Sequence, residues 1–292
     1  MATLRLPELI PSPTQDCETL MKAFKGLGTE EKEIIRVLGH RNASQRKQIR
    51  EAYQQLYNKS LIDDLRSELS GDFMEAVILW TYEPPERDAR LVNKALKSMK
   101  ELNESIEELQ VIVEIACASS PHHLAAVRRI YCSLFDCSIE EDIMESISLP
   151  LNKVLVGLVS SYRYDKEVVD IPTANLDAAK LHEAIQTQQL DNDDVIFILS
   201  VRNVFQLRAS FLCYQQNYQY SIDQVVRASV LGLGTNEDSL TRAIVSRAEI
   251  DLAEVRGEYE KITTSSSLDQ AVADDTSGDY RDFLMALLGA QL

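Results

Sequence analysis

The chain has 292 residues, of which 45% are hydrophobic and 26% are charged, and its formal net charge is −16. These values are ordinary for a globular protein, and the length allows one to three domains. The longest apolar runs, such as residues 154–159, are too short to span a bilayer. We expect no nucleic acid among the partners of this acidic chain.

The N-terminal residues 1–13 contain no sustained apolar segment and no cleavage site. The five cysteines form no CxxC pair, and their number is odd. Without a secretion signal, this pattern predicts reduced thiols in a cytoplasmic protein.

The pattern of prolines and apolar residues predicts an all-α fold. Residues 14–83 and 173–292 contain no proline, and helices tolerate proline only near their starts. Apolar residues recur at intervals of three and four, for example within residues 49–57 and 61–69. No segment shows the sustained alternation that is typical of a strand.

Residues 26–53 are similar to residues 232–259. Both segments begin with GLGT, and four further identities keep the same offset of 206: Arg36/Arg242, Arg41/Arg247, Arg50/Arg256 and Tyr53/Tyr259. Two weaker copies lie between them and place Tyr131 and Tyr214 at the position of Tyr53. Four copies of one helical unit predict a repeat architecture, in which each unit buries its apolar face against its neighbours.

The spacing of these tyrosines predicts a shortened third and fourth copy. Successive intervals are 78, 83 and only 45 residues. We therefore expect the third copy to lack its last helices and the fourth to lack most of its first. The predicted organisation is a tail (1–13), a first repeat (14–83), a second (84–164), a truncated third (165–224) and a fourth with a shortened first helix (225–292).

The two GLGT loops raise the question of what their paired glycines do. A glycine inside a helix costs about 1 kcal/mol relative to alanine. A GxG loop can turn so sharply that successive carbonyls point outward together, and such oxygens suit a hard cation such as calcium. An acidic residue follows each loop at a matched distance: Glu68 lies 39 residues after Thr29, and Asp275 lies 40 after Thr235.

A GxGT loop followed some forty residues later by a carboxylate, inside a fourfold helical repeat, resembles the annexin family. The segment at 161–172 and Trp80 are most similar to the plant branch. The resemblance implies calcium-dependent, reversible binding to acidic phospholipid membranes, with actin as a further partner. It also implies two calcium sites, whose ligands are the carbonyls of Phe24, Gly26 and Gly28 with Glu68, and those of Val230, Gly232 and Gly234 with Asp275.

The second and third copies depart from the family pattern. Neither has a GxG loop, and Ser146 takes the carboxylate position in the second copy. The equivalent carboxylate of the third copy falls in the missing stretch. We expect these two sites to be lost. Because the first and fourth repeats are neighbours in the family's fold, the two remaining sites are expected on one membrane-facing surface.

Three alternatives stay open at this stage. GLGT could merely end one helix and start the next, with Thr29 and Thr235 as N-caps. The chain could be a nucleotide hydrolase or a peroxidase-like enzyme, although no GxxxxGK[ST] motif or haem motif is present. It could also be a calcium-independent helical scaffold. Arg41, Arg202 and Arg247 are predicted to pair with carboxylates inside the bundle rather than to bind a ligand.

Overall fold

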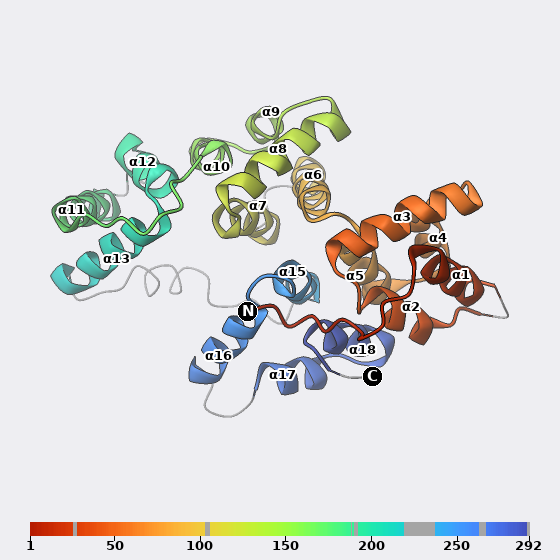
Figure 1. Cartoon of the computed structure of the whole chain (residues 1–292). Helices are drawn as coiled ribbons and strands as arrows, with labels where there is room; N and C mark the ends of the chain where they lie inside the picture. The colour runs from red at the N-terminus through yellow and green to blue at the C-terminus, as the bar shows by residue number, and fades with distance from the viewer. Residues whose placement is uncertain are drawn as a thin grey trace. The chain divides into compact units, whose positions relative to one another are not determined.

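The computed structural model describes residues 1–25, 28–102, 106–187, 189, 192–218, 237–262 and 267–290. All regular structure in these residues is α-helical, which confirms the all-α prediction (Figure 1). The helices are α1 (Pro13–Ala23), α2 (Glu31–Leu38), α3 (Ala43–Tyr57), α4 (Leu61–Glu68), α5 (Gly71–Thr81), α6 (Pro84–Leu102), α7 (Ile106–Ala118), α8 (Pro121–Phe135), α9 (Ile139–Ser146), α10 (Leu151–Ser160), α11 (Ile171–Thr187), α12 (Asp193–Val201), α13 (Val204–Tyr218), α15 (Glu237–Arg247), α16 (Leu252–Ile262), α17 (Leu268–Asp275) and α18 (Gly278–Leu287).

Several prolines lie where helices begin. Pro13 and Pro121 are the first residues of α1 and α8, and each follows a serine whose hydroxyl accepts a backbone N–H of the first turn. Pro84 opens α6, and Pro150 is the N-cap of α10. A proline at these positions removes no helical hydrogen bond, because the first N–H groups of a helix have no internal partner.

The chain divides into two compact units, one of residues 1–87 with 234–292 and one of residues 88–233. In the first unit α5 packs against α15 and α18, and α2 packs against α18, so the first and fourth copies share one core (Figure 1). Trp80 is buried there and donates its indole N–H to the carbonyl of Leu38 at 2.7 Å. Phe73 and Phe283 meet edge to face with ring centroids 6.0 Å apart.

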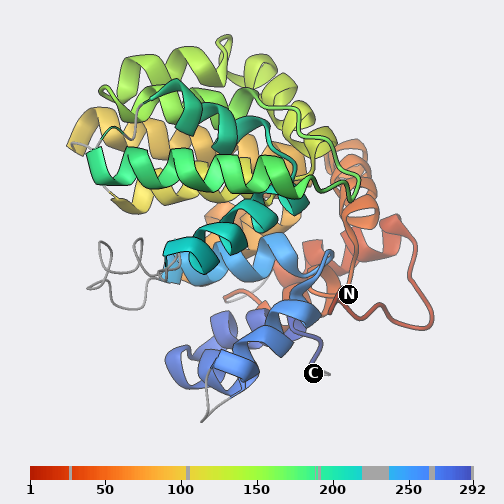
Figure 2. The same ribbon diagram turned by 90° about the vertical axis from the view of Figure 1, so that its left-hand side faces the viewer.

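The second unit contains two separate apolar clusters. One is formed mainly by α6–α10, and α10 packs against α7, α9 and α12. The other belongs to α11–α13, where α11 lies along α13 (Figure 2). The buried side chains of this second cluster are few, and three of them are alanines. The third copy therefore has a small core of its own.

Each of the three arginines predicted to form ion pairs has a carboxylate partner, and two of these carboxylates are buried. Arg41 and Asp16 form a bidentate pair with both N–O distances at 2.7 Å, and both side chains are almost fully buried. Arg202 and Asp177 form the same pair in the third copy, at 2.8 and 3.0 Å. Arg247 pairs with Asp251, one helical turn away. The prediction that these arginines pair within the bundle is confirmed.

The tyrosine that was used to align the copies of the repeat has a different hydrogen-bond partner in the third copy. Tyr53 donates its hydroxyl to Asp64 at 2.6 Å, and Tyr131 donates to Asp142 in the same way, 11 residues later in both cases. Tyr214 instead meets the imidazole of His182 at 3.4 Å. Residues 219–236 lie outside the described part of the chain, so the shortening of the third and fourth repeats, and their boundaries, stay predictions.

Candidate functional site

The end of α4 returns to the loop that joins α1 and α2. The Thr29 hydroxyl donates a hydrogen bond to Oε2 of Glu68 at 3.0 Å, and it also lies 3.3 Å from the Glu68 backbone carbonyl. Gly28, the residue before Thr29, has φ +108°, a backbone conformation that suits glycine. The structure therefore brings the second glycine of the first GLGT loop and the acidic residue 39 positions later to one place.

Thr29 does not cap α2. The N-cap is Glu30, and no side chain caps this helix end. The alternative in which Thr29 serves as an N-cap is therefore wrong, because its hydroxyl is directed across to the end of α4. From the sequence, Thr29 was considered only as a helix cap, and its hydrogen bond to Glu68 was not predicted. The signal that could have found it is the similar distance from threonine to carboxylate in the two repeats, 39 and 40 residues.

Glu68 and Asp275 occupy matching positions in their repeats. Each is the last residue of an eight-residue helix, α4 or α17, which begins after a serine whose hydroxyl accepts a backbone N–H. Each helix is followed by two extended residues and then by a glycine with φ +60°, Gly71 or Gly278. Both carboxylates are exposed. The two turns thus present an acidic side chain to solvent in the same local geometry.

Only part of each candidate ligand set lies in the described residues. Phe24, Gly28, Glu68 and Asp275 are described, whereas the remaining candidates, Gly26, Val230, Gly232 and Gly234, lie outside the described residues. The structure therefore describes the carboxylate of the fourth repeat but not its loop. In the first repeat it describes both edges of the loop and the carboxylate.

Ser146 takes the same place in the second repeat. It ends α9, another eight-residue helix that follows a capping serine, Ser138. Its hydroxyl is buried and makes no hydrogen bond within the structure. A neutral hydroxyl in this position offers no negative charge to a cation, which agrees with the expected loss of this site.

The chemistry of the first loop suits an oxygen-preferring cation. Within the described residues, no three or more His, Cys, Asp or Glu side chains gather where they could hold a metal ion. A site here must therefore take most of its ligands from backbone carbonyls, with Glu68 as the charged group. Calcium accepts such ligands, whereas zinc and copper prefer nitrogen and sulfur.

Two groups of the first repeat's core, Cys17 and Tyr53, have raised pKa values. Burial raises the pKa of the Cys17 thiol to about 11, and the neighbouring Asp16 acts in the same direction. Burial and the hydrogen bond to Asp64 raise the pKa of Tyr53. Both groups are held in their protonated form at neutral pH, so their contribution is to packing and hydrogen bonding.

Comparison with known proteins finds one family. The family model described as Annexin matches residues 15–80, 176–232 and 224–287. Annexin D3 of Arabidopsis thaliana is 51% identical over 323 aligned positions, which cover 100% of both chains. A solved structure of annexin III has a TM-score of 0.85 and 29% identity, and the match covers 99% of this chain and 97% of that one. A calcium-bound structure of annexin (Sm)1 has a TM-score of 0.76 and 25% identity, with 99% and 93% covered.

The fold defines a class of protein: a helical repeat array in which the first and fourth copies share one core. The chain belongs to the annexin family, and its similarity to the Arabidopsis protein makes it an annexin of plant type.

Two details of the comparisons concern the length of the repeats. The second and third family matches overlap, so residues 224–232 match both the end of one repeat and the start of the next. The alignment with the Arabidopsis protein has 323 positions and this chain has 292 residues, so at least 31 positions have no residue of this chain.

Proposed function

We propose that this protein binds acidic phospholipid membranes reversibly when calcium is present, through the loops of its first and fourth repeats. The single observation that carries the proposal is the contact between Thr29 and Glu68, because it brings a carboxylate to the GLGT loop. Membership of the annexin family supports the same activity.

The proposed ligands of the first site are the carbonyls of Phe24, Gly26 and Gly28 together with the Glu68 carboxylate. The fourth repeat is proposed to use the carbonyls of Val230, Gly232 and Gly234 with Asp275. Glu68 has one oxygen engaged by Thr29, which fixes the orientation of the carboxylate and leaves its other oxygen for a cation. When bound, calcium would supply the positive charge and the open positions that lipid phosphate oxygens require.

Because the net charge is −16, the protein is expected to need bound calcium before it can approach an acidic membrane. An anionic leaflet near −30 mV repels each negative surface charge by roughly 0.7 kcal/mol before salt screening. Each proposed ligand set has one carboxylate and three neutral carbonyls, so a bound divalent cation retains a local charge of about +1. The membrane therefore meets a positive loop on an otherwise negative protein.

The small number of charged ligands also limits the affinity of each loop for calcium. With a single carboxylate, each loop is expected to bind calcium weakly, at about 10⁻⁴ to 10⁻³ M without lipid. Because lipid phosphates would complete the ligand set, calcium and membrane are expected to strengthen each other's binding reciprocally.

The proposed attachment is peripheral, to membranes that face the cytoplasm. In the described part of the chain, no helix combines the length and the apolar composition that a membrane span requires. Attachment through two surface loops would be reversed when the cation is removed.

Co-sedimentation with phosphatidylserine liposomes tests the proposal. The protein is expected in the pellet at millimolar calcium, in the supernatant after chelator is added, and in the supernatant with phosphatidylcholine liposomes at the same calcium concentration. Pelleting that persists in chelator would overturn the proposal and favour the calcium-independent scaffold. Failure to pellet at millimolar calcium would also overturn it.

A further inference from the structure

The N-terminal residues 3–12 cross the first unit as a strap that is held at both ends. Thr3 is buried, and its hydroxyl donates a hydrogen bond of 2.6 Å to the last carbonyl of α18. The carbonyl of Arg5 accepts a hydrogen bond of 3.0 Å from Nδ1 of His40, just after α2 ends. At the other end, Ser12 caps α1. Figure 1 shows this segment running past α18 and α2 to the start of α1.

The middle of the strap lines a pocket of about 940 Å³, which lies within the first unit. The apolar part of the lining comes from the strap and from α2: Leu6, Pro7, Leu9, Pro11 and Ile35. Among the described residues, no backbone hydrogen bond joins residues 6–11 to another segment. Leu6 and Leu9 are exposed to solvent. The pocket therefore has an uncovered apolar wall, and its volume lies in the range of small-molecule sites.

The two acidic side chains of the pocket already have arginine partners. Oε2 of Glu33 accepts hydrogen bonds of 3.0 and 2.5 Å from the guanidinium of Arg36, which also lines the pocket. Asp282 lies 3.6 Å from Nε of Arg281. Neither carboxylate is therefore left to neutralise a further cation of the pocket.

Two cations of the pocket, Arg5 and Lys32, have no such partner. Within the described part of the chain, neither side chain forms an ion pair or a hydrogen bond, and both are exposed. Lys32 lies in the first turn of α2. Nε of Arg5 lies close to Gly289, about 3.5 Å from the place that a Cβ atom would take there. In a chain with a net charge of −16, this pocket combines an apolar wall with two unpaired positive charges.

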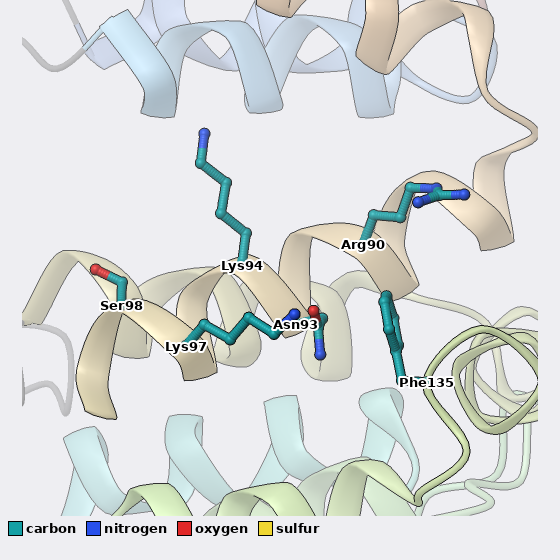
Figure 3. Close-up of a pocket in the computed structure, with 6 residues that line it drawn as sticks. All are labelled: Arg90, Asn93, Lys94, Lys97, Ser98 and Phe135. Atoms are coloured by element: carbon teal, nitrogen blue, oxygen red, sulfur yellow. The ribbon is translucent and has the colours of Figure 1, made fainter. Parts of the chain in front are cut away.

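A smaller pocket in the second unit lacks such spare charge. It has a volume of about 500 Å³ and lies along α6, from which Arg90, Lys94 and Lys97 project (Figure 3). Arg90 and Lys94 already interact with other groups of the chain, and the Lys97 ammonium lies 5.7 Å from the centre of the Phe135 ring. The cations of this smaller pocket are engaged by the protein itself.

We propose that the pocket beside the strap binds an amphiphilic organic anion, a molecule with an apolar chain and one anionic headgroup. Arginine and lysine donate charge-assisted hydrogen bonds to carboxylate and phosphate oxygens, so Arg5 and Lys32 would hold the headgroup. The apolar wall would cover the chain, and both surfaces would leave water. This binding is separate from the proposed calcium loops and needs no calcium.

Isothermal titration calorimetry in chelator tests the proposal, with decanoate, 1-decanol and acetate as probes below the concentration at which micelles form. Chelator keeps the calcium loops empty, so failure of this proposal is distinguishable from failure of the membrane proposal. Decanoate is expected to bind at least tenfold more tightly than decanol, which lacks the charge. It is expected to bind at least a hundredfold more tightly than acetate, which lacks the chain. Equal affinity for decanoate and either of the other probes would overturn the proposal.

The variant that tests the headgroup contacts is Arg5→Gln with Lys32→Gln. Both side chains are exposed, and glutamine keeps the backbone carbonyl that His40 contacts, so the strap is expected to stay in place. Each lost charge-assisted contact lowers affinity roughly tenfold, so decanoate should bind about a hundredfold more weakly, with decanol unchanged. The control is Lys22→Gln with Arg66→Gln, which removes the same charge from exposed positions of the first unit outside the pocket. Equal losses in the two variants would overturn the proposal, because they would show a response to net charge alone.

The variant that tests the apolar wall is Leu6→Ser with Leu9→Ser. Both leucines are exposed, so circular dichroism should show an unchanged helical content. The variant is expected to bind decanoate and decanol about tenfold more weakly than the wild type, because less of the chain can be covered. Unchanged affinity for both probes would place the ligand elsewhere and overturn the proposal.

The chemistry of the headgroup is distinguished by a second anion, decyl phosphate. If decanoate binds the wild type at least tenfold more tightly, the pocket takes a carboxylate, as in a fatty acid. If decyl phosphate binds more tightly by the same factor, it takes a phosphate monoester, as in a lipid with one chain. Similar affinities would show that the pocket accepts either headgroup. Absence of binding by both anions would overturn the proposal.

Discussion

Thr29 and Glu68, 39 residues apart in the chain, are joined by a hydrogen bond of 3.0 Å from the threonine hydroxyl to Oε2 of the carboxylate. The bond ties the loop after α1 to the end of α4. It holds the acidic side chain in a fixed orientation at the surface, and a preorganised ligand loses less entropy when a cation arrives.

The first prediction concerns the two carboxylates. Glu68→Gln and Asp275→Asn keep the shape of each side chain but remove its negative charge and one good oxygen ligand. Each change is expected to raise the calcium concentration for half-maximal liposome binding by roughly tenfold, and the double change to nearly abolish binding. Helical content measured by circular dichroism should stay the same, because both side chains are exposed.

Ser146 provides the matched control for these changes. It ends α9 in the place that Glu68 takes at the end of α4, but it carries no charge. Ser146→Ala should leave the calcium midpoint at the wild-type value. A double carboxylate variant that still pelleted at the wild-type midpoint would show that the GLGT loops are only helix connectors.

The second prediction concerns the hydroxyl of Thr29. Thr29→Val keeps the β-branched shape but removes the donor to Glu68, so the carboxylate gains rotational freedom. The loss of one such bond, about 0.5 to 1.5 kcal/mol, should raise the calcium midpoint about threefold. The control is Thr19→Val, which removes a hydroxyl that bonds within α1. An unchanged midpoint for Thr29→Val would show that Glu68 needs no orientation.

The third prediction compares the two buried ion pairs. Asp16→Asn leaves the Arg41 guanidinium, with 2% of its side chain exposed, without a charged partner. Removing one member of a buried pair costs about 3 to 5 kcal/mol. Asp177→Asn should cost less, because 26% of the Arg202 side chain is exposed and water can solvate part of its charge. Melting temperatures from calorimetry would check this order, and an equal or reversed order would contradict the argument from burial.

Sequence reasoning reached the helical fold and the return of Glu68 to the first loop because both depend on regular spacing. Helix periodicity is local, and a fixed number of helices between loop and carboxylate brings the chain back to its start. The ion-pair partners of Arg41 and Arg202 could not be predicted from spacing. Asp16 and Asp177 lie on other helices, and only the packing of those helices brings them to Arg41 and Arg202.

The contact of Tyr214 with His182 was likewise beyond prediction. Its residue types differ from the Tyr–Asp pairs of the first and second repeats.

The fourth prediction is a loss of stability in alkaline solution. Burial raises the pKa of Cys17 from its ordinary value of 9.0 to about 11. Below pH 9 the thiol is protonated in both states. Between pH 9 and 11 the unfolded chain releases this proton while the folded chain keeps it, so stability falls as pH rises, by on the order of 2 kcal/mol in total. Above pH 10 the buried Tyr53 and Tyr131, whose pKa values are also raised by burial, add to the fall.

Cys17→Ala isolates the thiol in this prediction. The variant is less stable at every pH because it loses buried sulfur, but its stability should depend less steeply on pH between 9 and 10.5. Urea unfolding at three pH values in this range would measure the slope. A slope equal to that of the wild type would mean that the Cys17 proton does not contribute.

The fifth prediction concerns the proposed shortening of the third and fourth repeats. In the third repeat, several large apolar side chains on α12 and α13 are exposed, including Phe197, Val201, Val204 and Leu212. Among the described residues of the first repeat, Leu56 is the one such residue. The core of α11–α13 is small in the described residues, and Tyr214 contacts His182 where Tyr53 and Tyr131 contact an aspartate. A repeat that cannot cover its apolar face is expected to be unstable or to associate with other copies.

Restoring about 35 residues after Tyr218, with the corresponding segment of Annexin D3, should therefore raise the melting temperature and the fraction of monomer. The length follows from the interval of 45 residues against 78 and 83, and the added helices would bury apolar surface at about 25 cal/mol per Å². A glycine–serine insert of the same length is the control, since it lengthens the chain without adding buried surface. Differential scanning calorimetry and size-exclusion chromatography with light scattering would measure both quantities. If the restored chain and the wild type melted at the same temperature with the same monomer fraction, α11–α13 would be a self-sufficient unit, and its exposed apolar residues would carry no cost to stability.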